Sequence, residues 1–221
     1  LSSFLAHAGD EIGNGGDAVL CKDDSGTIIS AVMLDYYEGR HREVSLDLGA
    51  PELSPHQKVE LALERLFEKN NFFANQLRQK AQSFFNNSSF KKNIELRDIP
   101  DSNEVFLERG CAIHQIAINQ KVVYPGDKKY VVSKDLWDLL DNDNKAGLIL
   151  HEIIYDSFIE QGHINSRAAR YLNALLSSQA FEAYSMDQYE ELKQLLKYNH
   201  FVDIWSVLSD YDLDVGKIYT F

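Results

Sequence analysis

The chain has 221 residues, of which 44% are hydrophobic and 11% aromatic. These fractions are typical of a globule with a packed core and exclude an intrinsically disordered chain. The formal net charge of −12 argues against the phosphate backbone of nucleic acids, or an anionic membrane surface, as a partner. No apolar run is long enough to cross a bilayer. We therefore expect no nucleic-acid partner and no membrane span.

The first eight residues, LSSFLAHA, have features of the end of a signal peptide. Ala6-His7-Ala8 has the small-x-small form of a signal-peptidase site, and an apolar pair stands just before it. The alternative is a short amphipathic segment of the folded domain. On the first interpretation, residues 1–8 are a signal-peptide remnant, residues 9–221 form a single α+β domain, and the protein is secreted or periplasmic.

Residues 13–39 predict a β-hairpin. Residues 18–21 and 27–36 are rich in β-branched and apolar side chains, and Asp23-Asp24-Ser25-Gly26 between them is typical of a turn. The glycine-rich run at 13–17 resembles a phosphate-binding loop only superficially, because it lacks the Lys-Ser/Thr ending. We therefore expect no nucleotide site there.

The period changes to a helical one at Ser54. Ser54 can cap a helix and Pro55 suits its first position. Apolar residues then recur at helical spacing to about Phe85, with a break expected at Asn70-Asn71. A polar loop follows.

The middle of the chain has the composition of strands and its last part that of helices. The predicted strands are 93–99, 104–107, 111–118, 121–124 and 130–132. A short helix is expected at 133–140, a longer one capped by Asp143 or Asn144 and ended by Gly162, one capped by Asn165 or Ser166, and one from Ser185 or Asp187 to about Tyr198. The pattern predicts an α+β fold with an N-terminal β-hairpin and long helix, a mixed central sheet and a mostly helical C-terminal half.

The two cysteines, Cys21 and Cys111, both lie in segments with strand composition. In an exported protein they could pair and close a loop of about 90 residues, which contributes on the order of 4 kcal/mol in the chain-entropy model. Two buried free thiols are the alternative, and their spacing matches no metal motif.

The most informative stretch is AGLILHEIIYDSFIEQGH, residues 146–163. On a helix turning about 100° per residue, Tyr155 projects between His151 and Glu152, so the three polar tips share a face. Asp156 follows Glu152 by one turn as a like-charged neighbour. The other faces are apolar, which predicts a core helix and a raised pKa for an unpaired Glu152.

Such a carboxylate is the usual material of general acid/base catalysis. We therefore take Glu152, Tyr155 and His151 as candidate catalytic residues. The alternative is that Glu152 is exposed or in an ion pair and that His151 is a core histidine with its hydrogen bonds satisfied.

The motif His151-Glu152-Ile153-Ile154-Tyr155 resembles the His-Glu-x-x-His helix of zincin metalloproteases. The likeness covers roughly residues 110–165, because a strand and short helix at 129–140 precede the motif helix as in that family. By position, His151 matches the first metal ligand and Glu152 the general base, while Tyr155 stands in the place of the second ligand. The resemblance implies a hydrolase of peptidase type.

The tyrosine puts the metal of that family in question. A phenol ligates poorly until it loses its proton near a pKa of about 10. His163 lies two positions beyond the place of the third histidine in the extended metzincin pattern. We therefore expect no bound cofactor, with zinc as the alternative.

A wider likeness is to a group of secreted proteins of predatory bacteria. The shared stretches are the glycine-rich start with its hairpin, the His-Glu-Ile-Ile-Tyr helix, and residues 162–171, GHINSRAARY. This resemblance implies export and a common fold but no activity.

Three functions fit these features. The first is a secreted, zincin-like protein that is weakly hydrolytic or binds peptide or protein. The second is a lysozyme-like hydrolase of cell-wall glycan, in which Glu152 or Glu160 acts as general acid with Tyr155 or Tyr171 as hydroxyl partner. An acidic surface would suit deacetylated peptidoglycan, whose amines are free. The third is a non-catalytic envelope protein. Asp210 to Gly216 has the alternating aspartates of a calcium loop but lacks its final glutamate.

Overall fold

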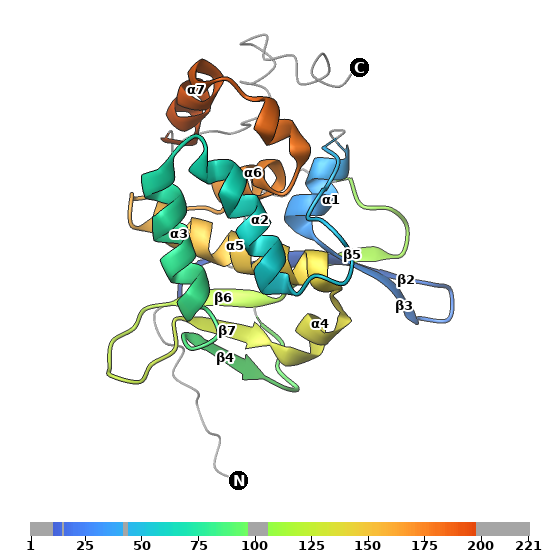
Figure 1. The fold of residues 1–221 in the computed structure, drawn as a ribbon. Coiled ribbons are helices and arrows are strands. Elements are labelled where there is room, and N and C mark those ends of the chain that lie inside the picture. Colours follow the sequence, from blue (N-terminus) through green and yellow to red (C-terminus); the bar gives the residue numbers. More distant parts are fainter. Residues whose placement is uncertain (1–10, 15, 42–43, 97–105, 198–221) are drawn as a thin grey trace.

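The computed structural model describes residues 11–14, 16–41, 44–96 and 106–197 (Figure 1). The signal-peptide interpretation of residues 1–8 and the calcium-like run at 210–216 lie outside these residues. The described part has the expected α+β composition, with helices and two small sheets. No described helix is both long and apolar enough to cross a membrane.

The strands form a four-stranded and a three-stranded sheet, with orders β1-β6-β7-β4 and β3-β2-β5. Only the β4–β7 pair is parallel; the other pairs are antiparallel. The strands are β1 (Glu11–Asn14), β2 (Asp17–Lys22), β3 (Ile28–Met33), β4 (Ser88–Lys91), β5 (Cys111–Gln115), β6 (Ala117–Gln120) and β7 (Tyr130–Ser133).

The two sheets are joined by one bent ribbon. β1 and β2 pair with β6 and β5, and the bend lies at Gly16 and Ile116. The carbonyl of Gly16 accepts hydrogen bonds from the backbone N–H groups of Ile116, at 2.9 Å, and Ala117, at 3.1 Å. The glycine corner therefore holds the two sheets together.

The helices cover the upper side of the sheets (Figure 1). They are α1 (Leu34–His41), α2 (Pro55–Phe67), α3 (Asn71–Ser83), α4 (Lys134–Leu139), α5 (Asn142–Ile159), α6 (Arg167–Leu176), the 3-10 helix η1 (Gln179–Ala183) and α7 (Met186–Lys197). α5 packs against α1, α2, α3, α6 and β3, so it is the central helix of the core.

Local sequence signals explain where several helices begin. Ser54 and Gln57 form the capping box of α2, and Asn70 caps α3 by accepting from the N–H of Phe73. The expected break at Asn70-Asn71 is therefore a true boundary, and the predicted long helix is two helices packed side by side. α5 is capped by Asp141, not by Asp143 or Asn144 as predicted.

The end of α5 follows the expected signal. Gly162 has a φ of 91°, a left-handed conformation that glycine adopts without strain. The N–H of His163 returns to the carbonyl of Phe158 at 3.0 Å and that of Gly162 to Ile159 at 2.9 Å. The last turn of the helix therefore has its carbonyls satisfied.

Several strand predictions differ from the structure. The described part of the strand predicted at 93–99, residues 93–96, is not a strand, and the strand predicted at 111–118 is divided between β5 and β6. The strand expected at 27–36 ends at Met33, and α1 follows at once. β4 occupies 88–91, in the segment predicted as a loop, and 121–124 is not a strand. Of the strand predicted at 104–107, residues 106 and 107 are described, and they are not in a strand. Local β-propensity was overridden where tertiary packing favours a helix or a turn.

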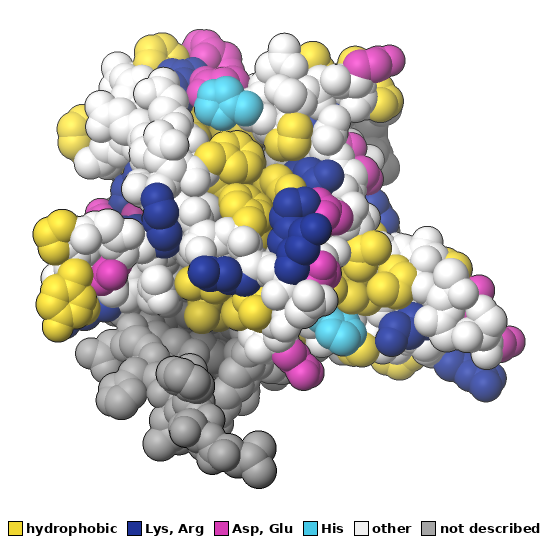
Figure 2. All heavy atoms as spheres, turned by 90° about the horizontal axis from the view of Figure 1, so that it is seen from below, with side chains coloured by type: hydrophobic (Ala, Val, Ile, Leu, Met, Phe, Trp, Pro, Cys, Tyr) yellow, Lys and Arg dark blue, Asp and Glu magenta, His cyan; other side chains and the backbone are white. Residues whose placement is uncertain are grey.

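The lower part of the molecule is aromatic. Phe85, Phe90 and Trp137 pack together, with ring centres 5.3–6.1 Å apart. Figure 2 shows the molecule from below, with Lys and Arg side chains standing around exposed hydrophobic ones. The charge of this acidic chain is therefore not uniform over its surface.

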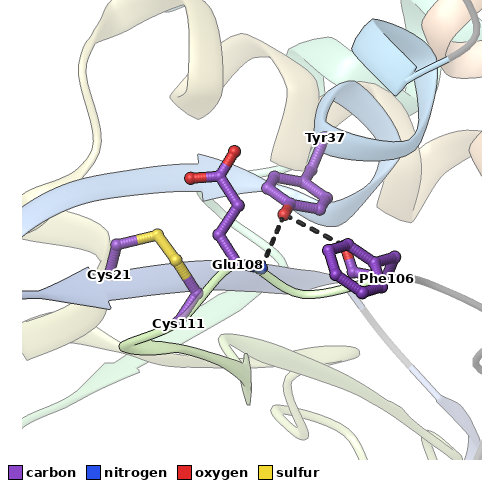
Figure 3. Close-up of a disulfide and its surroundings, with 5 residues drawn as sticks. All are labelled: Cys21, Tyr37, Phe106, Glu108 and Cys111. Carbon is purple, nitrogen blue, oxygen red and sulfur yellow. Dashed lines mark hydrogen bonds between the residues drawn. A yellow bond between two sulfur atoms is a disulfide. The ribbon is translucent and has the colours of Figure 1, made fainter.

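Cys21 and Cys111 form a disulfide. They lie directly opposite each other on β2 and β5, close to the loop that leads into β5 (Figure 3). The hydroxyl of Tyr37 donates to the carbonyl of Phe106 at 3.2 Å and accepts from the N–H of Glu108 at 3.3 Å. The disulfide and Tyr37 together fix this loop to the hairpin and to α1.

The packing of α5 against α1 leads to a stability prediction. A Cβ on Gly147 would lie 2.6 Å from the ring of Tyr36, which is fully buried and hydrogen-bonded to Ser177 at 2.8 Å. We expect Gly147→Ala to lower the free energy of unfolding by about 1–3 kcal/mol through overpacking, although alanine favours helices.

Gly39→Ala is the matched control for this prediction. Gly39 also lies in a helix, and its Cβ would meet Ala174 at an ordinary 3.4 Å. Here the helix propensity should win and raise stability by up to about 1 kcal/mol. Urea unfolding of both variants measures the two effects, and equal shifts in the same direction would refute the packing argument.

Candidate functional site

Glu152 is fully buried at the centre of the molecule. Its Oε1 accepts a hydrogen bond of 2.6 Å from the backbone N–H of Gly16, and its Oε2 accepts one of 2.9 Å from Nδ2 of Asn119 on β6. Burial raises the pKa of Glu152 to about 7, although the positive charge of His151 and the bond from Gly16 oppose the rise. The carboxyl group is therefore divided between its protonated and ionised forms near neutral pH.

Gly16 must be a glycine for this contact to form. A Cβ there would lie 2.2 Å from Cδ1 of Leu148 and 3.3 Å from Oε1 of Glu152. The absence of a side chain lets the corner of the ribbon approach α5 closely enough to donate its N–H. The glycine-rich run, set aside as a phosphate loop, is thus the backbone donor to Glu152.

His151 has a different set of partners. Its Nδ1 lies 2.9 Å from Oδ2 of Asp35 on α1, and the same oxygen accepts a bond of 2.6 Å from Nδ2 of Asn173 on α6. Burial alone would lower the pKa of His151, but the charge of Asp35 and the hydrogen bond to it raise the pKa to about 9. The same pairing outweighs burial at Asp35 and lowers its pKa.

The other ring nitrogen of His151 is unsatisfied. Nε2 is buried and has no hydrogen-bond partner within the described ranges of the chain. A buried polar atom without a partner costs free energy. The ring orientation that bonds Nδ1 to Asp35 therefore stabilises one nitrogen and leaves Nε2 with this cost.

Tyr155 is also fully buried, and its ring centre lies 6.0 Å from that of His151. The two rings are neighbours, as the helical angles predict. The carboxylate of Glu152, however, is directed to the ribbon and β6, while the imidazole is directed to α1 and α6. The three side chains therefore do not converge on one reactive point.

The secondary candidates are spread around α5. Asp156 is buried and paired with Lys80, at 2.5 Å, and with Lys129. Glu160 is exposed and also pairs with Lys80, at 2.8 Å. The two lysines explain how Asp156 stands one turn from Glu152, because they offset its charge.

His163 and Tyr171 do not contact the Glu152 carboxyl group. The ring of His163 stacks on Phe158 with centres 4.7 Å apart, and burial lowers its pKa. Tyr171 is buried and forms a side-chain hydrogen bond with Tyr184. Neither position makes these residues partners in a reaction at Glu152.

The glycine-rich start, the motif helix and residues 162–171 meet at α5. The run at 162–171 begins α6, where Arg170 is buried and donates to Glu38 at 3.1 Å and to Oγ of Ser166 at 3.2 Å. Gly16 from the glycine-rich start contacts the same helix. The glycine-rich start, the motif helix and the run at 162–171 are thus packed together around α5.

The donor set does not fit the zinc of the zincin resemblance. A phenol stands where a second imidazole would be needed, and both oxygens of Glu152 accept from protein groups. His151 alone, with Nδ1 bonded to Asp35 and Nε2 free of any partner among the described residues, has the arrangement of a metal-ligating histidine. No group of three His, Cys, Asp or Glu side chains in the described part of the chain could hold a metal ion. In addition, β7 has neighbours on both sides, so it is not an edge strand.

Comparison of the chain with protein-family models, with curated proteins and with solved structures gives no match in any of the three.

Two cavities lined by described residues lie away from this helix face. One, between α3, α6 and α7, is mainly apolar and is lined in part by Phe73, Leu172 and Leu196. The other lies beside β5 and the start of α4. Neither includes His151, Glu152 or Tyr155.

Sequence reasoning did not find the partners of the motif. Asp35, Asn119 and Asn173 lie on α1, β6 and α6, far from the motif in the chain. Gly16 alone left a visible signal, a glycine within a run of glycines at the start of a hairpin. Asp35 was assigned to a strand, which hid its position on a helix facing α5.

The buried carboxyl and imidazole groups predict that the free energy of unfolding falls as the pH rises. The pKa of Glu152 is raised to about 7 from 4.5, so its contribution is complete below about pH 4.5 and is lost as the pH rises through 7. The pKa of His151 is raised to about 9 from 6.5, so its contribution to stability is complete below about pH 6.5 and is lost as the pH rises through 9. We expect the free energy of unfolding to fall between pH 5 and pH 9.

Glu152→Gln should remove the part of this fall in the free energy of unfolding that comes from Glu152. The size of its pKa shift makes that part roughly 3 kcal/mol. Urea unfolding at intervals of pH measures it, and the exposed Glu160→Gln serves as control because it should leave the slope unchanged. An identical pH profile in Glu152→Gln and the parent would show that Glu152 ionises normally in the fold.

Proposed function

We propose that this chain is a secreted or periplasmic protein that binds peptide or protein segments, and that its His-Glu-x-x-Tyr helix is structural. The observation that carries the proposal is the burial of His151, Glu152 and Tyr155, together with the two protein partners of the Glu152 carboxyl group. A general base or metal ligand must reach a substrate, and these groups reach only the core.

Two further features support the proposal: a disulfide supports export, and the net charge supports a cationic ligand. The Cys21–Cys111 disulfide belongs to the class of bonds that persist in oxidising compartments. The net charge of −12 favours a cationic ligand or one with free amines.

A second candidate is a cell-wall glycan hydrolase with Glu152 as general acid. The pKa of about 7 at Glu152 favours it, because an acid that is protonated near neutral pH can donate to a leaving group. This function requires that the ribbon corner at Gly16 move away from α5 to admit the polymer. A zincin-like peptidase would need the same opening and also a metal.

Turnover assays separate these functions. We expect no cleavage of casein, acetylated peptidoglycan or deacetylated peptidoglycan above the background of a heat-inactivated sample, because no substrate reaches Glu152. Peptidoglycan cleavage that disappears in Glu152→Gln would establish the glycan hydrolase in place of our proposal.

Metal content gives an independent measurement. Protein purified without chelators should hold only traces of zinc, since the motif lacks a ligand set. Stoichiometric zinc that is lost in His151→Ala, with retention in His163→Ala, would establish a zincin-like centre instead. Binding to an immobilised array of peptides with systematically varied charge tests the binding function itself.

A further inference from the structure

The loop between β6 and β7 carries an exposed apolar tip. Val122, Val123 and Tyr124 are 52%, 57% and 71% exposed. The backbone N–H of Gln120 donates to the carbonyl of Lys129 at 2.9 Å and closes the base of the loop. Figure 1 shows this segment standing away from the ends of the two strands. Successive hydrophobic side chains therefore lie at the end of a projection.

The backbone of this tip has internal partners. Oδ2 of Asp127 accepts from the N–H groups of Val123, at 3.0 Å, and Tyr124, at 2.8 Å. The N–H of Asp127 donates to the carbonyl of Tyr124 at 3.1 Å, and Pro125 has no N–H. An N–H group without a partner is costly to remove from water. These bonds therefore lower the cost of placing the tip in a medium of low polarity, and they set two amide dipoles against the Asp127 charge.

Lysine side chains flank the tip. Lys121 and Lys128 are exposed, and Nζ of Lys128 donates to the backbone carbonyl of Asn86 at 2.5 Å. This partner is neutral, so the charge of Lys128 remains. Lys129, by contrast, pairs with the buried Asp156 and serves the core of the fold. The loop therefore presents cations on either side of its apolar tip.

The same surface continues at the end of α3. Phe85 adjoins the residue that holds Lys128, and it is 49% exposed. Its ring packs edge-on against Trp137, over which Nζ of Lys145 lies, 5.8 Å from the ring centre. Figure 2 views the molecule from below and shows Lys and Arg side chains around exposed hydrophobic ones. Basic and apolar groups are thus interleaved there.

A lipid surface fits this shape better than a folded protein partner does. A projecting apolar tip requires a matching pocket in a protein, whereas a bilayer admits it between the headgroups. Tyrosine suits this boundary because its ring is apolar and its hydroxyl is hydrated, and lysines are attracted to the phosphates of anionic lipids. Binding of this kind increases with the apolar area inserted and with the charge of the lipid.

We infer that this surface docks the protein on a membrane that contains anionic lipid. Val123 and Tyr124 enter the headgroup region, and the flanking lysines contact lipid phosphates. The net charge of −12 argues against such a partner on average, but a bilayer interacts mainly with charges within a Debye length, about 8 Å. The inference goes beyond the proposed peptide binding. We call the surface the lower patch, and it consists of Phe85, Lys121, Val122, Val123, Tyr124 and Lys128.

The test is co-sedimentation of the full chain with lipid vesicles. Binding should be saturable on vesicles of equal parts phosphatidylcholine and phosphatidylglycerol, at least tenfold weaker on phosphatidylcholine alone, and reduced by added salt. The double variant Val122→Asn, Val123→Asn should weaken binding to the mixed vesicles at least tenfold. Its unfolding midpoint should be unchanged, because both side chains are exposed. Ile29→Asn is the matched control, since Ile29 is 66% exposed but lies on β3, outside the lower patch.

Two further measurements address the lysines and the depth of the tip. Lys121→Gln with Lys128→Gln should reduce binding to mixed vesicles to the level seen with phosphatidylcholine alone. The tryptophan of Tyr124→Trp should shift its emission to shorter wavelength when mixed vesicles are added, because the indole leaves water. Ile29→Trp should show no such shift.

The outcomes separate this surface from the proposed function. Absence of saturable binding to mixed vesicles, or equal binding by the parent and the valine double variant, would overturn the inference. Binding of soluble polyglutamate that is lost in the lysine double variant, without binding to vesicles, would assign the lower patch to an acidic protein partner instead. The peptide array tests the proposed function independently, so either can fail while the other stands.

Discussion

The hydrogen bond from the N–H of Gly16 to the carboxyl group of Glu152 links parts of this fold that lie 136 residues apart in the sequence. The bond can form because the ribbon bends at Gly16, which has no side chain, and because Glu152, the buried glutamate of α5, lies next to this bend. With the bond from Asn119, it ties both sheets to the central helix. Loss of this contact would leave a buried carboxyl group without donors, which is more costly than the bond itself is favourable.

The second ionic group, Asp35 with His151 and Asn173, acts on the opposite side of the same helix. Burial raises the pKa of both carboxyl groups, but the charge of His151 and the hydrogen bonds from His151 and Asn173 outweigh it at Asp35, whereas at Glu152 the opposing effects do not. Buried ion pairs are poor evidence for stability by themselves, because desolvation offsets much of their attraction. Here they fix the rotation of α5 relative to α1 and α6, and so determine which of its faces meets the ribbon.

Signals that act within a few residues were read correctly from the sequence: the capping box at Ser54, the boundary at Asn70-Asn71, the glycine end of α5 and the strand composition around both cysteines. Failures arose where a partner lies far along the chain. The strand predicted over 27–36 includes the first three residues of α1, and packing against α5 and α6 places them in a helix. Asp35 lies 116 residues before its partner His151 and 138 residues before its partner Asn173. No local pattern in the sequence encodes such pairings. The angular argument correctly made Tyr155 the neighbour of His151 but could not show that Glu152 is bound elsewhere.

A His-Glu pair on a helix is ambiguous because the properties that suit catalysis, burial and a displaced pKa, also arise when polar groups organise a core. What separates the two cases is whether any capacity remains for a substrate. Both oxygens of Glu152 accept from the protein, and the Nε2 of His151, which does retain capacity, is enclosed. The hydroxyl of Ser133 is likewise buried and has no hydrogen-bond partner among the described residues. Unused hydrogen-bonding capacity therefore indicates a functional site in this chain only where a substrate can reach it, and both of these atoms are enclosed.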